Sequence, residues 1–171
     1  MDRDAALQML LDKDEIREVI GSRYARGLDW KDVAMLKSCF HDDAEVDYGF
    51  FKGSAHEWCE IILRPEPTLI NRYHYCYPAQ VQVTGSAAEA ESTSFTGRRY
   101  VEGERKMQRM VGSRYIDRLE KRDGAWRIAS RITRIEFVHA FPDETEAGQQ
   151  KAGFELFLDS SPLHPLYRKL Y

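Results

Sequence analysis

The sequence predicts an α+β fold in which helices come first and a curved antiparallel sheet of long strands follows. Three observations support this prediction. Apolar residues recur at helical spacing through the first third of the chain. From Ile70 to His139 they alternate with polar residues, and short turn sequences divide this region into segments. A chain of 171 residues without an internal repeat or linker is most simply one domain, 1–171.

The composition limits the partners and the compartment that we expect. A hydrophobic content of 43% is enough for a core, and a net charge of −3 argues against a nucleic-acid-binding surface. No apolar run approaches the roughly 20 residues of a membrane helix, and the first residues lack the charged-then-apolar pattern of a signal peptide. Cys39, Cys59 and Cys76 are widely spaced and odd in number, which fits reduced, packed thiols. We therefore expect a cytoplasmic protein with no nucleic-acid or membrane partner.

The longest helical pattern spans Leu11–Asp29. Asp12 is the predicted N-cap, with Glu15 completing a capping box. The apolar stripe of this helix consists of Ile16, Val19, Ile20, Tyr24, Gly27 and Leu28. Because Gly27 weakens the helix just before Asp29, that carboxylate is expected at a helix end beside the core. It is either a cap for the next helix or one half of an acid/base pair.

Shorter elements flank this helix. Ala5–Leu11 is predicted as a separate N-terminal turn of helix, and two more helices are predicted over Trp30–Phe40 and Gly53–Leu63. Between the last two, a loop leads into a short strand, Ala44–Tyr48, and the sequence FFKG is a second short strand or a turn. Arg64-Pro65 ends the third helix, because proline lacks a backbone donor and restricts the residue before it.

Four long strands are then predicted in sequence. They are Ile70–Val83, interrupted near Pro78, and Ala87–Val101, Met107–Lys121 and Trp126–His139. Arg122-Asp123-Gly124 is a hairpin turn of the Asp-Gly type. Of the tail that follows, Glu144–Leu158 is predicted to be helical, and the proline-containing segment after it is not.

Motifs for cofactors are lacking in the sequence. It contains no glycine-rich phosphate-binding pattern and no nucleophile elbow of the G-x-S-x-G type, which argues against nucleotide-binding and hydrolase chemistry. The five histidines are scattered and lack metal-ligand spacing. We therefore expect that the protein needs neither a metal nor an organic cofactor.

Three segments carry a family likeness. RYARGLDWKD, FHDDAEVDYG and RYIDRLEKRDGAWRIASR, within roughly Leu11 to Phe137, resemble the SnoaL-like branch of the nuclear-transport-factor-2-like superfamily. This resemblance implies a cone, in which a curved sheet wraps a pocket and the helices close its other side. The tail, 141–171, lies beyond the segment that carries the resemblance, and we expect that it could fold over the mouth of the cone.

The resemblance implies particular site residues as well. The scytalone dehydratases and hexachlorocyclohexane dehydrochlorinase of this superfamily are cofactor-free lyases with an Asp–His dyad, and Asp29 and His74 occupy the equivalent places. Tyr24 stands where the dehydrochlorinase has a lysine, Arg131 corresponds to its arginine, and Tyr48 lies where a dehydratase has a pocket tyrosine. Substrate-binding roles are expected for Arg131 and, in addition, for Trp58 on the third helix and His164 in the tail.

Elementary chemistry supports these roles and leaves alternatives open. An imidazole accepts protons near neutral pH, and a carboxylate on its other nitrogen fixes the tautomer. The tyrosines could instead be core residues with bonded hydroxyls, and His74 a structural group. Strand parity places Arg131 on the face opposite Ile128 and Arg134, unless a bulge intervenes.

The favoured function is a cofactor-free lyase acting by dehydration, elimination or retro-aldol-type cleavage on a hydroxylated aromatic or ring-bearing small molecule, as in catabolism of aromatic or lignin-derived compounds. Two alternatives are a ketosteroid-isomerase-like or polyketide-cyclase-like enzyme, and the non-catalytic small subunit of a ring-hydroxylating dioxygenase. Tyr73, Tyr75 and Tyr77 should share the outer face of the sheet, which suggests a homodimer or homotrimer.

Overall fold

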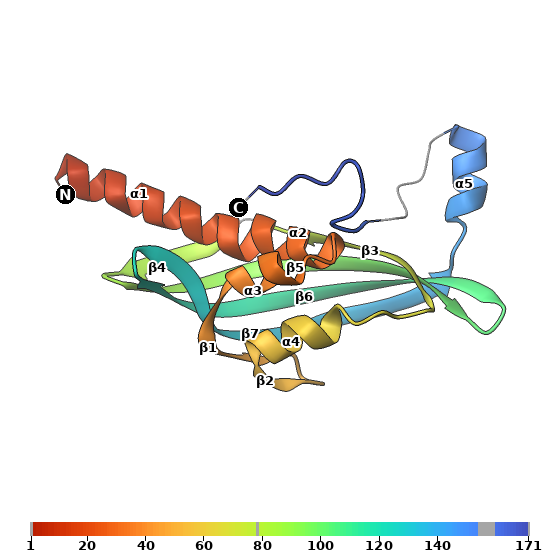
Figure 1. The fold of residues 1–171 in the computed structure, drawn as a ribbon, viewed down its shortest axis with the longest axis horizontal. Coiled ribbons are helices and arrows are strands. Elements are labelled where there is room, and N and C mark those ends of the chain that lie inside the picture. The colour runs from red at the N-terminus through yellow and green to blue at the C-terminus, as the bar shows by residue number, and fades with distance from the viewer. Residues whose placement is uncertain (1, 78, 154–159, 171) are drawn as a thin grey trace.

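Helices cover one face of a large, strongly curved sheet in the computed structural model, which describes residues 2–77, 79–153 and 160–170 (Figure 1). The helices are α1 (Arg3–Arg17), the π-helical segment η1 (Glu18–Arg23), α2 (Tyr24–Asp29), α3 (Val33–Ser38), α4 (Ala55–Ile62) and α5 (Thr145–Ala152). The strands are β1 (Phe40–Asp47), β2 (Lys52–Ser54), β3 (Leu69–Cys76), β4 (Gln80–Thr84), β5 (Ala87–Glu102), β6 (Arg105–Arg122) and β7 (Ala125–Pro142). This is the predicted α+β cone.

The sheet has the strand order β2-β1-β7-β6-β5-β3, with β4 also paired to β5. The predicted antiparallel meander is confirmed for β3 to β7, and the β6–β7 turn has positive φ at Asp123 (52°) and Gly124 (82°), as a type I′ hairpin requires. The sheet as a whole is mixed, however, because β1 pairs with β7 in parallel. The predicted first long strand is divided into β3 and β4, and the residue at the predicted interruption, Pro78, lies outside the described residues.

The N-terminal helix begins earlier than predicted. It starts at Arg3 and continues through η1 and α2 to Asp29, so the separate first turn and the capping box at Asp12 are wrong. The Asp12 carboxylate is instead engaged by Trp126 Nε1 at 2.9 Å and Lys121 Nζ at 2.7 Å, and Glu15 accepts the backbone N–H of Trp126. Both acidic residues therefore attach the helix to the β6–β7 hairpin.

The later helices are shorter than predicted. The second spans only Val33–Ser38, since Asp32 caps it through a 2.9 Å bond from the backbone N–H of Met35 and Phe40 already belongs to β1. The third, Ala55–Ile62, is confirmed and is capped by Ser54. In the tail, α5 ends at Ala152, and the rest of the predicted helix falls mostly on residues outside the described ranges.

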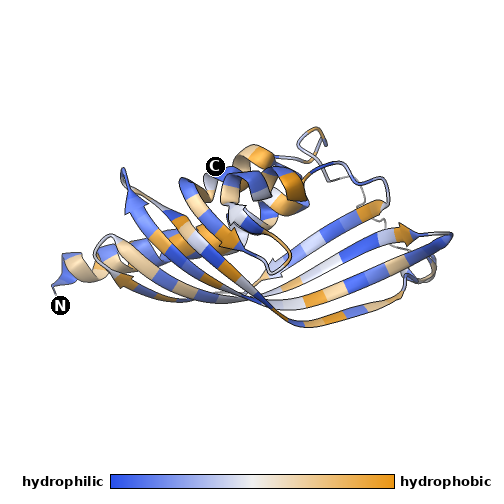
Figure 2. Ribbon diagram, turned by 90° about the horizontal axis from the view of Figure 1, so that it is seen from below, coloured by the Kyte–Doolittle hydropathy of each residue, from blue (hydrophilic) through white to orange (hydrophobic). Residues whose placement is uncertain are grey.

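The two faces of the sheet differ in character, and hydrophobic and hydrophilic residues alternate along its strands (Figure 2). The inner face packs on the helices around a core that includes Ile16, Ile20, Leu36, Phe40, Leu119, Trp126 and Ile128. On the outer face the Tyr73 ring lies over Gly97, where an added Cβ would meet it at 2.0 Å. Tyr75 and Tyr77 share that face and are each 60% exposed. A homo-oligomer formed through this face stays a prediction.

Within the described ranges, no helix combines the length and apolarity needed to cross a membrane.

Asp12 should make stability depend on pH. Burial alone would raise the pKa of Asp12, but its hydrogen bonds from Lys121, Trp126 and Gln8 outweigh this effect and hold the pKa below its ordinary value. The carboxylate therefore stabilises the fold above its unfolded pKa of about 4, and this contribution is lost as the pH falls through the lowered folded pKa.

Thermal melts between pH 3 and pH 7 test this linkage. The decrease in Tm caused by Asp12→Asn should be largest near neutral pH and should shrink below about pH 4. Asp14→Asn, an exposed change on the same helix, should have little effect at any pH. A decrease for Asp12→Asn that does not vary with pH would contradict the proposed linkage.

Candidate active site

A cavity of about 360 Å³ lies between the helices and the inner face of the sheet. Its lining comes from α2, α4 and strands β3, β5, β6 and β7, and includes Tyr24, Leu28, Tyr48, Trp58, Ile62, His74, Thr96, Val111, Tyr115 and Thr133. The wall is mainly apolar and aromatic with a few polar groups, as is usual for small-molecule sites. A larger hollow of about 580 Å³ among Gln82, Glu89 and Arg118 contains none of the predicted site residues.

Asp29 and His74 meet beside this cavity. Asp29 Oδ1 lies 2.6 Å from His74 Nδ1, and Asp29 Oδ2 accepts the backbone N–H of His74 at 3.0 Å. His74 is on the edge strand β3, and Asp29 is the last residue of α2, so the helix end satisfies a backbone donor that the sheet leaves open. The predicted contact between the two side chains is confirmed.

This contact fixes the chemistry of the ring. An ionised carboxylate can only accept, so Nδ1 carries the proton and Nε2 keeps the free lone pair in neutral His74. The His74 side chain is 9% exposed and lines the cavity, whereas Asp29 is not part of the lining. Among the described residues Nε2 has no hydrogen-bond partner. The arrangement can therefore accept a proton from a molecule in the cavity.

Tyr24 and Tyr48 form a hydroxyl pair in the same wall. Their oxygens are 2.6 Å apart, and both residues are buried. Burial raises the pKa of Tyr24 and of Tyr48 well above the ordinary value, and the Arg131 cation only partly opposes it. Both hydroxyls therefore stay protonated at neutral pH. One donates its proton within the pair, and the accepting hydroxyl keeps its own O–H for a ligand.

Arg131 lies behind these tyrosines rather than in the lining. Its Nε and Nη2 donate to Asp117 at 2.7 and 2.8 Å, and its guanidinium carbon is 4.2 Å from the ring centroids of both Tyr24 and Tyr115. Strand β7 contains a bulge, because Leu119 of β6 pairs with Ile128 whereas Arg118 pairs with Ser130, which leaves one extra residue in β7. The alternation of side chains between the two faces of the sheet changes at that point. The bulge turns Arg131 to the buried side, so its predicted substrate contact is corrected to a contact with the tyrosines.

Trp58 forms the aromatic wall opposite the dyad strand. It stacks on Tyr48 with ring centroids 4.0 Å apart, and Phe50 packs edge-on to it at 5.6 Å. Both Trp58 and Phe50 line the cavity, and Phe50 is 77% exposed. These rings offer stacking surfaces to a flat ligand, as predicted for Trp58.

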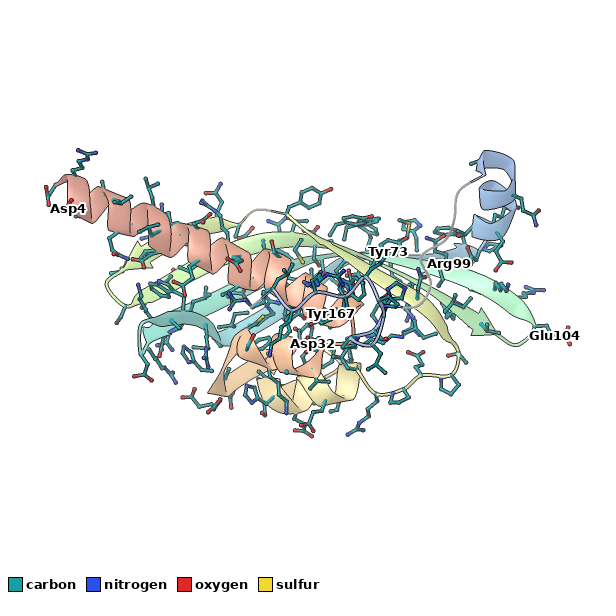
Figure 3. The ribbon with its side chains drawn as sticks, turned by 45° about the horizontal axis from the view of Figure 1, so that its top comes forward. Asp4, Asp32, Tyr73, Arg99, Glu104 and Tyr167 are labelled. Atoms are coloured by element: carbon teal, nitrogen blue, oxygen red, sulfur yellow. The ribbon has the colours of Figure 1, made fainter. Side chains whose placement is uncertain are left out.

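The described residues of the C-terminal tail lie outside the cavity. His164 and Tyr167 pack on the Trp30 ring with centroid separations of 5.9 and 5.3 Å, and Tyr167 donates to Asp32 (Figure 3). Arg26 Nη2 donates to the Arg168 carbonyl at 2.6 Å. None of the tail residues that the structure describes lines the cavity, so the expected cavity contact of His164 is corrected to a contact with the helices.

Sequence reasoning missed several polar residues of the lining, among them Arg72, Arg98, Arg109 and Tyr115. Arg72 has the same strand parity as a recognised residue, since it lies two positions before His74. The sequence could have shown this shared face, but it does not specify the strand pairing that brings the three arginines together. Burial raises the pKa of Cys39 and of Cys59 to about 12, which disfavours their reactive thiolate forms.

Metal-binding groups are also absent from the described ranges, where no three histidine, cysteine or acidic side chains come together.

Comparison with known proteins places this geometry in context. The family model of the SnoaL-like domain matches residues 8–132. Hexachlorocyclohexane dehydrochlorinase LinA-type3 from Novosphingobium barchaimii is similar in structure, with a TM-score of 0.69 and 20% identity over 80% of this chain and 94% of that one. A putative scytalone dehydratase from Novosphingobium aromaticivorans gives a TM-score of 0.65 and 20% identity over 78% and 90%.

A putative aromatic ring hydroxylase from Novosphingobium aromaticivorans is similar too, with a TM-score of 0.66 and 17% identity over 81% and 97% of the two chains. At these identities the similarity concerns the fold. No protein of curated function matches the sequence.

Proposed function

The chain belongs to the SnoaL-like domain family, and we propose that it is a cofactor-independent lyase acting on a hydroxylated aromatic or other ring-bearing small molecule. The observation that carries the proposal is the 2.6 Å contact of Asp29 with His74 at the edge of a mainly apolar and aromatic cavity. Folds of this kind host many functions, so the proposal depends on the site rather than on the fold.

In the proposed reaction His74 Nε2 takes a proton from a carbon next to the one that bears a hydroxyl. The electron pair of the C–H bond forms the new double bond, and the C–O bond breaks. Tyr48 donates its proton to the departing hydroxyl, which leaves as water, and the proton on His74 restores the tyrosine through the Tyr24–Tyr48 pair or through solvent. Asp29 stabilises the imidazolium in the meantime. If the base instead takes the hydroxyl proton, the same groups support retro-aldol cleavage.

The two alternatives fit the site less well. In an isomerase with Asp29 as the base, a carboxylate oxygen would have to reach the ligand, but both Asp29 oxygens are bonded to His74 and Asp29 does not line the cavity. A purely supporting subunit would leave the dyad without a role. The position of the proposed base therefore favours the lyase.

Turnover by the protein alone tests the proposal. Purified protein, dialysed against EDTA, would be incubated with aromatic compounds that carry a β-hydroxyl group, and mass spectrometry would follow loss of water or a one-carbon fragment. We expect turnover by the wild type and none by His74→Gln. Turnover that requires an added metal or cofactor, or a panel with no product above the His74→Gln background, would overturn the proposal.

Tyr48→Phe tests the acid of this reaction. Loss of one preorganised donor should lower kcat by about 10²–10³-fold with a small change in KM, because the hydroxyl acts mainly on the developing charge. The matched control is Tyr73→Phe, whose hydroxyl accepts from Gln108 on the outer face of the sheet. Equal effects of the two substitutions would show that Tyr48 does not donate to the leaving group.

A further inference from the structure

Three arginines form a row on the cavity side of the sheet. In the antiparallel register Arg72 of β3 is opposite Arg98 of β5, and Arg98 is opposite Arg109 of β6. All three line the cavity. Like charges directly opposite each other on neighbouring strands destabilise a sheet. The arginine row therefore destabilises this part of the sheet while no ligand is bound.

The surrounding groups neutralise only part of this charge. Arg98 pairs with Glu66, and Arg72 Nη1 donates to the Ile62 carbonyl at 2.8 Å. Arg109 lies with its guanidinium carbon 5.6 Å from the Tyr100 ring centroid and makes neither an ion pair nor a hydrogen bond within the described part of the chain. Burial, and next the charge of Arg98, lower the pKa of Arg72, which agrees with unrelieved repulsion in the row.

The acidic groups that act on Arg72 are Glu66 and Asp29, and Glu66 is also the partner of Arg98. Arg109 has no acidic partner among the described residues, and a single anion would supply one. Guanidinium groups bind carboxylates through paired, charge-assisted hydrogen bonds, and the cavity of about 360 Å³ is otherwise apolar and aromatic.

The arginine row has a defined position relative to the proposed base. His74 is opposite Thr96, and Thr96 is opposite Val111, so the His74 row is the next row on the same face. Residues two apart along a strand are separated by about 7 Å. An anion on the arginines would therefore be held one row of the sheet away from His74.

We propose that the substrate carries a carboxylate, and that Arg109, assisted by Arg72 and Arg98, binds it and so orients the ring toward His74. This inference rests on the proposed function for the identity of the reacting end, but the anion site itself does not depend on turnover. Removal of one arginine from the row should weaken the carboxylate contact without harming the fold, because it also removes repulsion.

Matched acid and amide ligands test the site. Calorimetry would compare benzoate, 4-hydroxybenzoate and 4-hydroxycinnamate with their neutral amides on wild type, Arg109→Gln and Arg105→Gln. Arg105 provides the control because it carries the same charge on the same strand, is exposed and does not line the cavity. We expect the wild type to prefer at least one acid over its amide by about 10-fold or more, since hydrogen bonds to charged groups are strong.

Arg109→Gln should abolish that preference and leave the amide affinity and Tm within experimental error, whereas Arg105→Gln should preserve the preference. The proposal is overturned if no acid binds better than its amide, if no acid binds at millimolar concentration, or if the preference survives in Arg109→Gln. A preference lost equally in both variants would also overturn it. Since the readout is binding, a protein that discriminates but has no turnover would refute the lyase and leave the anion site standing.

Discussion

His74→Gln is expected to lower kcat by about 10²–10⁴-fold, the usual contribution of a general base, with substrate binding largely intact. Glutamine keeps the polarity and approximate size of the side chain but cannot take up the proton. Asp29→Asn should also lower kcat strongly, because an amide can present an N–H to Nδ1, favour the wrong tautomer and no longer stabilise the imidazolium. The measurement is steady-state kinetics on a substrate found in the screen.

The double variant separates a dyad from two independent residues. If the residues act as one unit, His74→Gln/Asp29→Asn should lose little more activity than His74→Gln alone. His56→Gln is a matched control, since His56 lies on α4 and does not line the cavity. Near-full activity of His74→Gln would mean that the base lies elsewhere, and a failure of either single variant to fold would support a structural role for that residue.

Sequence patterns predicted the fold because it depends on local signals, whereas the pairing of Asp29 with His74 was implied by the family resemblance. The change of hydrophobic period located the helices and the meander, and the placement of Asp29 at a helix end and His74 in an alternating strand survived errors at the start of the helix. Asp12 was misassigned because its partners, Lys121 and Trp126, are more than 100 residues away. When only neighbours in sequence are considered, an aspartate that caps a helix cannot be distinguished from one that binds residues far away in the chain.

The remaining features depend on how strands pair, which local patterns do not specify. One extra residue near Ala129 reverses the parity of β7 and moves Arg131 under the tyrosines. The arginine row likewise exists only in the register that aligns Arg72, Arg98 and Arg109. The parallel pairing of β1 with β7 joins segments separated by almost half of the chain. Each of these determines the polar part of the cavity, so the site was less predictable than its dyad.

The Asp117–Arg131 ion pair should be the most sensitive point of the fold, because both side chains are fully buried. Asp117→Ala leaves the Arg131 cation buried without its partner and is expected to destabilise the protein by about 3–5 kcal/mol. Denaturant unfolding would measure the loss. A change of 1 kcal/mol or less would mean that Arg131 finds solvent or another partner.

A double substitution can separate the contribution of this pair to folding from its contribution to chemistry. Replacing a buried ion pair by apolar residues of similar volume is often neutral or stabilising, so Asp117→Leu/Arg131→Met should recover much of the stability lost in Asp117→Ala. The double variant nevertheless lacks the cation that lies 4.2 Å from the Tyr24 ring and opposes the raised pKa of Tyr48. We therefore expect it to fold and to lose activity, because the Tyr48 proton becomes harder to transfer. Recovery of both stability and activity would assign the pair to folding alone.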